Sequence, residues 1–216
     1  MSSESRAHTG TRRRGRVDYD SSRRDRILHT AMEQFADKGF AAVRIDEIAA
    51  SAGANKQLIY YYFQSKSDLY ESVLEHMVEE TSKMWDFLET APSLEAALWR
   101  LSDWSEFSAV WRRLLAWEGL EYGSGDGTIR LEAARTASWS RWVAIVRRAQ
   151  ERGEISADLD HEMFALLLIS MSGITTSLPQ VAKMVVTHAE PDSKEFQQRY
   201  LELITTMVKS VSPERR

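Results

Sequence analysis

The stretch that decides the fold is residues 45–66, which read IDEIAASAGANKQLIYYYFQSK. The apolar residues of its first half recur at i, i+3, i+4 and i+7, the spacing of a helix with one buried face: Ile45, Ile48, Ala49 and Ala52. Gly53 follows directly, at the position where a left-handed residue ends a helix without a Cβ penalty. The stretch therefore begins with a short helix and a tight turn.

A second short helix follows the turn. Asn55 can cap it by accepting a bond from a backbone N–H two or three residues later, and Ile59 and Phe63, four residues apart, can anchor it in a core. This leaves amide, ammonium and phenol groups exposed in its first two turns, on Asn55, Lys56, Gln57, Tyr60 and Tyr61. A recognition helix presents such groups to base edges in the major groove, so the pattern predicts a helix-turn-helix that binds DNA.

The same segment resembles the DNA-binding module of the TetR family of transcriptional regulators. The resemblance covers residues 24–74 and rests on fixed spacings of Phe35, Gly39, Ile48, Ala49, Ala52, Gly53, Ile59, Tyr60, Tyr62, Phe63, Ser65, Lys66 and Leu69. Two positions depart from the family pattern. Val43 and Arg44 stand where a Thr or Ser commonly starts the first helix of the motif, and Ala54 with Asn55 replaces Val-Ser.

These residues lead to a set of expected DNA contacts. We expect Lys56 and Gln57 at base edges, Tyr60 against a thymine methyl group, and Tyr62 and Lys66 on phosphates. Arg44, Asn55 and Tyr61 complete the expected DNA-binding set. Ser65 and Asp68 form a capping-box pattern at the start of the next helix, to about residue 88. The resemblance implies that movement of this helix transmits ligand binding to the DNA-binding head.

The charge of the chain is unevenly distributed. Its net charge is −4, but residues 1–66 carry 12 Lys and Arg against 8 Asp and Glu, whereas the remainder carries 16 against 24. The basic end is therefore the one with the motif, as expected for an end that meets a polyanion. We expect residues 1–21 to be a disordered basic arm, with Ser21 or Ser22 capping the first helix. Two interpretations of the arginines at 12–14 and 16 stay open: entry into a minor groove, or a solvated tail with non-specific attraction.

Composition and motifs argue against other classes. The 216 residues include no cysteine, no apolar run approaches the ~18 residues of a membrane span, and no apolar segment near the N-terminus suggests a secretory signal. The histidines show no metal-ligand spacing, the Gly-rich run at 123–127 lacks the features of a phosphate-binding loop, and no nucleophile motif is present. We therefore expect a cytoplasmic protein that is not an enzyme, with no cofactor, no metal and no catalytic residues.

The remainder of the chain reads as helix throughout. The predicted fold is all-α, with about nine helices: a three-helix DNA-binding head at 22–67 and a helical ligand-binding and dimerisation domain at 68–216. Ser93, Asp160 and Ser193 are expected N-caps in the second domain, and Gly153 and Pro179 are expected helix ends.

All seven tryptophans lie after the head, which predicts a wide apolar region there. A wall of Trp and Met with a few polar groups is typical of small-molecule sites, although an ordinary filled core remains the alternative for any single residue. The resemblance also implies such a pocket. Its expected lining is Trp111, Leu115, Glu118, Tyr122, Arg135, Trp139, Trp142, Met171 and Thr175. Arg135 would pair a ligand carboxylate and Glu118 a ligand cation, unless the two pair with each other.

The last predicted helix, residues 193–211, is apolar over a wide arc. One stripe, Phe196, Tyr200, Leu203 and Met207, is the expected dimer interface, which the resemblance implies is a four-helix arrangement formed with helix 160–177. A helix buried entirely within one chain is the alternative.

Together these features predict a homodimeric regulator, a repressor, that a small hydrophobic or aromatic effector releases from a palindromic double-stranded operator. The number of dimers for each operator stays open. The main alternative is an architectural DNA-binding protein without a ligand, which a fully packed tryptophan core would favour. The retained Lys56, Tyr60, Tyr62 and Lys66 argue against a helical interaction protein that no longer binds DNA.

Overall fold

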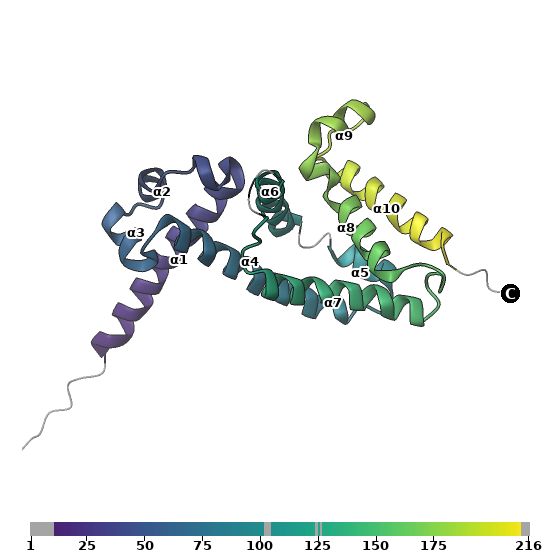
Figure 1. Ribbon diagram of the computed structural model, residues 1–216, viewed down its shortest axis with the longest axis horizontal. Coiled ribbons are helices and arrows are strands. Elements are labelled where there is room, and N and C mark those ends of the chain that lie inside the picture. Colours follow the sequence, from purple (N-terminus) through teal and green to yellow (C-terminus); the bar gives the residue numbers. More distant parts are fainter. Residues whose placement is uncertain (1–10, 102–104, 124, 126, 213–216) are drawn as a thin grey trace, which may run out of the picture. The chain divides into compact units, whose positions relative to one another are not determined.

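The computed structural model describes residues 11–101, 105–123, 125 and 127–212, with side chains for these except residues 11–21, 105, 106, 108 and 176. All regular structure in these ranges is helical (Figure 1). The helices are α1 (Thr11–Ala42), α2 (Ile45–Ser51), α3 (Lys56–Phe63), α4 (Lys66–Glu89), α5 (Leu94–Leu101), α6 (Ser105–Tyr122), α7 (Glu132–Glu151), α8 (His161–Ser177), α9 (Pro179–Val185) and α10 (Lys194–Ser210). The predicted all-α class is confirmed.

The chain divides into two compact units, Met1–Val73 and Leu74–Arg216, which we call the head and the body. The border falls within α4, so the first turns of this helix belong to the head and the later turns to the body.

The core of the head is built by one face of each of its helices. The side chains of α1 that face this core include Ile27, Ala31 and Phe35, and they are fully buried. Phe35 meets Tyr70 of α4 edge to face, with ring centroids 5.0 Å apart. Gly39 has φ 76° and ψ 164°, which interrupts the helical backbone of α1 near its C-terminal end. Only a residue without a Cβ adopts this backbone without strain.

The start of α1 differs from the expected cap at Ser21 or Ser22. The helix begins at Thr11 and runs through the arginine-rich run, because arginine has a high helix propensity and residues 11–21 contain no proline, while the single Gly15 costs only about 1 kcal/mol. Residues 1–10 of the expected arm lie outside the described residues.

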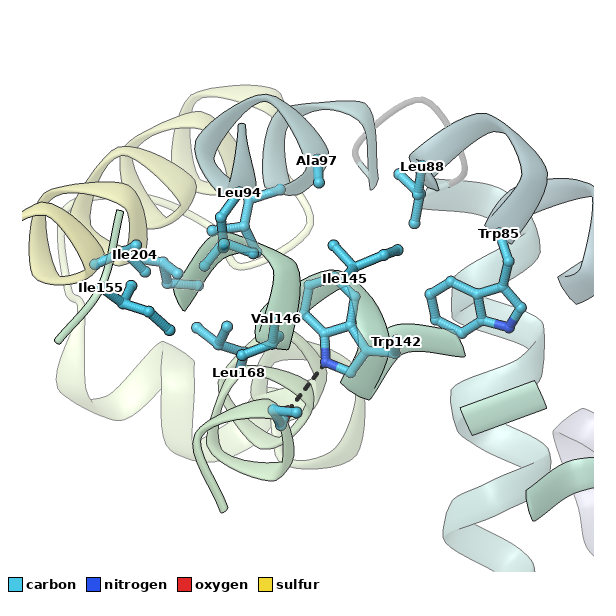
Figure 2. Packing of buried hydrophobic residues seen from close by; sticks show 14 of the residues in the cluster. Trp85, Leu88, Leu94, Ala97, Trp142, Ile145, Val146, Ile155, Leu168 and Ile204 are labelled. Carbon is cyan, nitrogen blue, oxygen red and sulfur yellow. Dashed lines mark hydrogen bonds between the residues drawn. The ribbon is translucent and has the colours of Figure 1, made fainter. Parts of the chain in front are cut away.

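The body is held by one apolar core that α4, α5, α7, α8 and α10 share (Figure 2). Trp142 of α7 is 2% exposed, and its indole N–H donates to the carbonyl of Ala165 at 3.1 Å. Trp85 of α4 stacks against Trp142 with ring centroids 6.1 Å apart. Each of these rings removes a large apolar area from water, so together they fix α4 and α7 to the centre of the body.

The caps of the body helices follow the sequence closely. The Asp160 carboxylate accepts from the N–H groups of Glu162 and Met163, and the Ser193 hydroxyl accepts from Phe196, which confirms both predicted caps. The Ser93 hydroxyl accepts from Ala96 as predicted. α7 has no side-chain cap and begins directly after Leu131, whose backbone is left-handed with φ 53°.

The sequence did not predict α9. Pro179 ends α8 as expected, but it also occupies the first turn of a new helix, where its missing N–H costs nothing. Among the described residues no single helix is long and apolar enough to cross a membrane; only His161–Thr175 and Pro179–Val185, which meet at 81°, reach that length and composition when taken together.

Arg141 links α7 to α4 on the side of these helices that carries polar groups. Its guanidinium donates to Glu89 at 2.8 Å, to Asp86 at 2.6 Å and to the carbonyl of Ser82 at 3.2 Å. The bond from Arg141 holds the pKa of Glu89 below its ordinary value. Several charge-assisted bonds from one rigid guanidinium make a stronger link than an isolated surface ion pair.

Arg141→Met should lower the free energy of unfolding by roughly 1–2 kcal/mol at neutral pH, because it removes charge-assisted bonds while keeping the apolar stem. A carboxylate with a depressed folded-state pKa contributes stability above its unfolded pKa and loses it as the pH falls. The difference between variant and wild type should therefore shrink as the pH falls through about 4. Urea unfolding at several pH values measures both effects.

Arg147→Met is the matched control, since Arg147 is exposed and lies 3.7 Å from the carboxylate of Glu151, one turn away on the same helix. We expect this substitution to change the free energy of unfolding by at most about 0.5 kcal/mol. An equal loss in the two variants, or a loss in Arg141→Met that is independent of pH, would show that the link contributes nothing specific.

Candidate nucleic-acid interface and small-molecule cavities

The position of α3 is fixed by the turn before it and by two buried anchors. Gly53 has φ 60°, and the Asn55 side chain accepts from the N–H of Leu58 at 2.8 Å, which confirms the predicted turn and cap. Ile59 and Phe63 are buried in the core of the head. The face of α3 opposite these anchors is therefore held toward solvent.

The exposed face of α3 carries the groups that the sequence predicted. Lys56 and Gln57 are exposed in its first turn, and Tyr60 and Tyr61 are 41% and 74% exposed. Tyr62 is half-buried, and its ring packs edge to face against that of Tyr61, with ring centroids 5.2 Å apart. An amide, an ammonium and two phenols on two exposed turns can hydrogen-bond base edges and phosphates.

Lys56 forms a weak, solvent-exposed ion pair in the free protein. Its ammonium lies 3.2 Å from the Asp46 carboxylate of α2, and both side chains are at least half exposed. An exposed pair of this kind contributes about 0–1 kcal/mol, so its exchange for a phosphate or a base costs little.

Lys66 and Arg44 lie at the N-termini of α4 and α2. The Lys66 ammonium donates to the carbonyl of Ala41 at 3.2 Å and lies 4.7 Å from the centre of the Phe40 ring. Arg44 is exposed and is the N-cap residue of α2, but its side chain makes no capping bond. The Ser65 hydroxyl accepts from the N–H of Asp68 at 3.0 Å and donates to its carboxylate at 2.8 Å, so the predicted cap is present.

The body contains a cavity of about 330 Å³ that we call the tryptophan cavity. Four residues of the predicted pocket line it: Trp111, Leu115, Trp139 and Trp142. Met84 and Trp85 of α4 complete one wall, and Leu168 and Ile169 of α8 lie in another. The expectation of a cavity rich in tryptophan thus has a counterpart in the structure.

A second cavity of about 650 Å³ lies among α5, α6, α8, α9 and α10. Thr175 of the predicted pocket lines this one, together with Tyr200. Leu101, Arg112, Leu168 and Ser172 line both cavities, so the two hollows share a wall.

Four predicted pocket residues line neither cavity. Arg135 and Glu118 form a two-bond ion pair, with both N–O distances 2.6 Å, so they pair with each other rather than face a ligand. Tyr122 is 53% exposed. Met171 packs against the body core, and its carbonyl accepts from the Tyr200 hydroxyl at 2.9 Å.

Sequence reasoning missed Arg112, which follows Trp111 on α6. Its stem packs over Gly173 of α8, where an added Cβ would lie 3.5 Å from the Arg112 Cδ. Burial lowers the pKa of its guanidinium. Its position next to Trp111 in the sequence was the one sign that it could line a cavity. Helical spacing on α6 alone could not show that Arg112, and not the more exposed Arg113, faces the interior.

The predicted interface stripe on α10 divides in two. Leu203 and Met207 are 54% and 47% exposed, as an interface requires. Phe196 is 6% exposed and stacks against Tyr200 with ring centroids 6.1 Å apart, so its side chain is buried within the body. On α8, Met163, Leu166 and Leu167 are also exposed.

Among the described residues, no group of three or more His, Cys, Asp and Glu side chains is placed to hold a metal ion.

Comparison with known proteins gives the same division of the chain. Residues 27–73 match the family model described as bacterial regulatory proteins, tetR family, and residues 97–209 match the tetracyclin repressor-like C-terminal domain. The transcriptional repressor SCO4008 of Streptomyces coelicolor is 39% identical over 165 residues, 74% of this chain and 82% of its own length.

Other relatives match in the head or in the fold. The repressor NicS of Pseudomonas putida is 44% identical over 68 residues, 31% of this chain and 32% of NicS. The structure of the ketosteroid regulator KstR2 of Mycobacterium tuberculosis is 17% identical, has a TM-score of 0.66 and covers 89% of this chain and 96% of that one, a likeness of fold. The two family models, and the match over most of the repressor SCO4008, show that this chain belongs to the TetR family of bacterial regulatory proteins.

Proposed function

We propose that this DNA-binding regulator is a homodimeric repressor of a pseudo-palindromic operator and that a small apolar or aromatic effector releases it. The observation that carries the DNA-binding role is the exposed face of α3, which holds Lys56, Gln57, Tyr60 and Tyr61 outward while Ile59 and Phe63 fix the helix. Two such heads related by a two-fold axis would read half-sites about one helical turn apart.

Selection of bound sequences from a pool of random duplexes tests this role. We expect the selected sequences to share two inverted half-sites. Selected duplexes without any shared sequence would instead favour the architectural alternative.

The cavities of the body support the effector role over that alternative. A protein that only packs DNA needs no hollow, whereas a hollow lined largely by apolar side chains, beside a second one of mixed polar and apolar lining, suits an organic ligand. One helix, α4, carries core residues of the head such as Leu69 and wall residues of the tryptophan cavity such as Trp85. A ligand that favours one position of α4 would thereby favour one position of the head. A coupling free energy of ~1–3 kcal/mol between effector binding and operator binding corresponds to a roughly 5–150-fold loss of operator affinity.

The DNA contacts separate into two classes with different signatures. Lys66→Ala should weaken binding to duplexes of every sequence to the same extent, since it removes one phosphate contact. It should also reduce the slope of log affinity against log salt concentration by about one unit. Gln57→Ala should instead cost ~1–3 kcal/mol at particular base pairs. Fluorescence anisotropy with the selected operator and single-base variants measures both. Identical changes in specificity for the two variants would contradict the assignment.

Because Lys66 also contacts Ala41 within the head, unfolding curves must accompany the binding data. Lys194→Ala, at an exposed lysine in the first turn of α10, is the matched control for the loss of one positive charge. It should leave affinity and salt slope unchanged.

The dimer is proposed to form through the exposed apolar residues of α8 and α10. Leu203→Glu should yield a folded monomer with greatly reduced operator affinity, because Leu203 is exposed in the single chain but an unpaired carboxylate at an interface costs several kcal/mol. Sedimentation velocity reports the mass, and circular dichroism reports the fold.

Lys194→Glu is the control, since nine residues at about 100° each place Lys194 on the opposite side of α10 from Leu203. It should remain dimeric. A dimeric Leu203→Glu protein would place the interface elsewhere.

A further inference from the structure

The wall of the tryptophan cavity contains a buried hydrogen-bond donor that the protein does not use. Trp111 of α6 lines this cavity and is 7% exposed, yet its indole nitrogen has no hydrogen-bond partner in the part of the chain that the structure describes. The large majority of buried polar groups in native proteins are paired, because a buried donor without an acceptor loses its bond to water and gains none in return. An acceptor on a ligand would satisfy this N–H.

Two other buried tryptophans of the same wall are paired within the protein. The Trp85 N–H donates to the Ser138 hydroxyl at 2.8 Å, and the Trp142 N–H donates to the carbonyl of Ala165 at 3.1 Å. Trp85 and Trp142 line the cavity as Trp111 does. The fold thus supplies an acceptor for the indoles of Trp85 and Trp142 and supplies none for that of Trp111.

Trp111 is held in place by an ion pair that leaves its N–H unpaired. The Arg135 guanidinium lies over one face of the indole, 5.4 Å from the ring centre. The two carboxylate oxygens of Glu118 each accept from this guanidinium at 2.6 Å. A cation over an aromatic face is an attractive contact, so it fixes the ring and leaves the opposite face and the edge to border the cavity.

The serine hydroxyls of α8 in this wall are engaged within their own helix. Ser170 donates to the carbonyl of Leu166 at 2.9 Å, and Ser172 donates to the carbonyl of Ile169 at 2.8 Å. A ligand oxygen that enters the cavity therefore finds these two donors in use and the Trp111 N–H without an acceptor.

We propose that the effector carries a carbonyl oxygen that accepts a hydrogen bond from the Trp111 N–H, while its apolar body lies against Trp139 and Trp142. This inference rests on the proposed effector role of the tryptophan cavity and adds the functional group by which the ligand is recognised. The indole nitrogen is covered by its neighbours, so the oxygen reaches it through a small side-chain movement in the wall, a common change on binding. A site of this kind selects against a ligand of the same shape without the acceptor, because that ligand leaves the donor unpaired.

Two uncharged probes of nearly equal shape test the proposal. They are 2-acetylnaphthalene, which has a carbonyl oxygen, and 2-isopropenylnaphthalene, which has a methylene group in its place. Equilibrium dialysis against the full-length protein gives both affinities. Wild type should bind the ketone at least as tightly as the alkene, because the Trp111 N–H replaces the bond to water that the ketone loses on entry.

Two replacements of Trp111 then remove the donor. Trp111→Phe keeps an aromatic ring, and 3-benzothienylalanine at this position keeps the shape of the indole with sulfur in place of the N–H. Each should weaken the ketone at least about fivefold relative to the alkene, since the buried oxygen then stays unpaired. Trp139→Phe is the matched control: it shortens the same wall, so it should lower both affinities by similar factors and leave their ratio unchanged. Circular dichroism shows whether each variant remains folded.

The carbonyl stretch of the bound ketone is a second readout, independent of affinity. A hydrogen bond weakens the C=O bond, so infrared difference spectra should place this stretch at a lower wavenumber in wild type than in either Trp111 replacement. Trp139→Phe should keep the wild-type position.

The possible outcomes separate this inference from the proposed function. A ketone-to-alkene ratio that survives the benzothienylalanine replacement, an unshifted carbonyl stretch, or an equal change of the ratio in Trp139→Phe would overturn the role of Trp111 while leaving a ligand cavity in place. Failure of both probes to bind, together with unaltered tryptophan emission, would count against the tryptophan cavity as an effector site and so against the proposed function on which this inference rests.

Discussion

The functional surface of the head depends on how α3 is held. A helix of eight residues is not stable by itself in water, so its position comes from its ends and from tertiary packing. The Asn55 cap closes its first turn, and Ile59 and Phe63 seat it in the core. With three points fixed, the helix cannot rotate without exposing a large apolar side chain. The outward direction of Gln57 and Tyr61 is a consequence of this packing.

Local rules in the sequence were sufficient to predict this part of the molecule. A glycine that needs a left-handed backbone, an asparagine that caps, and apolar residues four positions apart each act within a few residues, and Gly53, Asn55 and Ile59 behave as predicted. The start of α1 was predicted less well, because a charged run with few apolar residues suits a helix extension as well as a free arm. α9 was not predicted because a proline after a helical segment indicates the end of that helix, and Pro179 also starts the next one.

The body shows the limits of the same reasoning. Helix existence and caps follow from sequence, but which face of a helix lines a cavity depends on neighbours that are distant along the chain. Arg135 and Glu118, 17 residues apart, pair with each other, while Arg112 occupies the wall that was expected for Arg135. Periodicity also placed Phe196 and Leu203 on one stripe, although only Leu203 is exposed. These assignments need the three-dimensional packing of α6, α7, α8 and α10.

The chain has no cysteine, so one introduced thiol can carry a DNA-cleaving iron chelate at a chosen place. Tyr61→Cys puts it on the exposed face of α3, and Arg147→Cys puts it on α7 of the body as a control. If α3 enters the major groove, the Tyr61→Cys conjugate should cut the selected duplex in two clusters about one helical turn apart, and the control should not. Uniform cutting by both conjugates, or none from Tyr61→Cys on a bound duplex, would contradict the assignment of α3 as the DNA-reading helix.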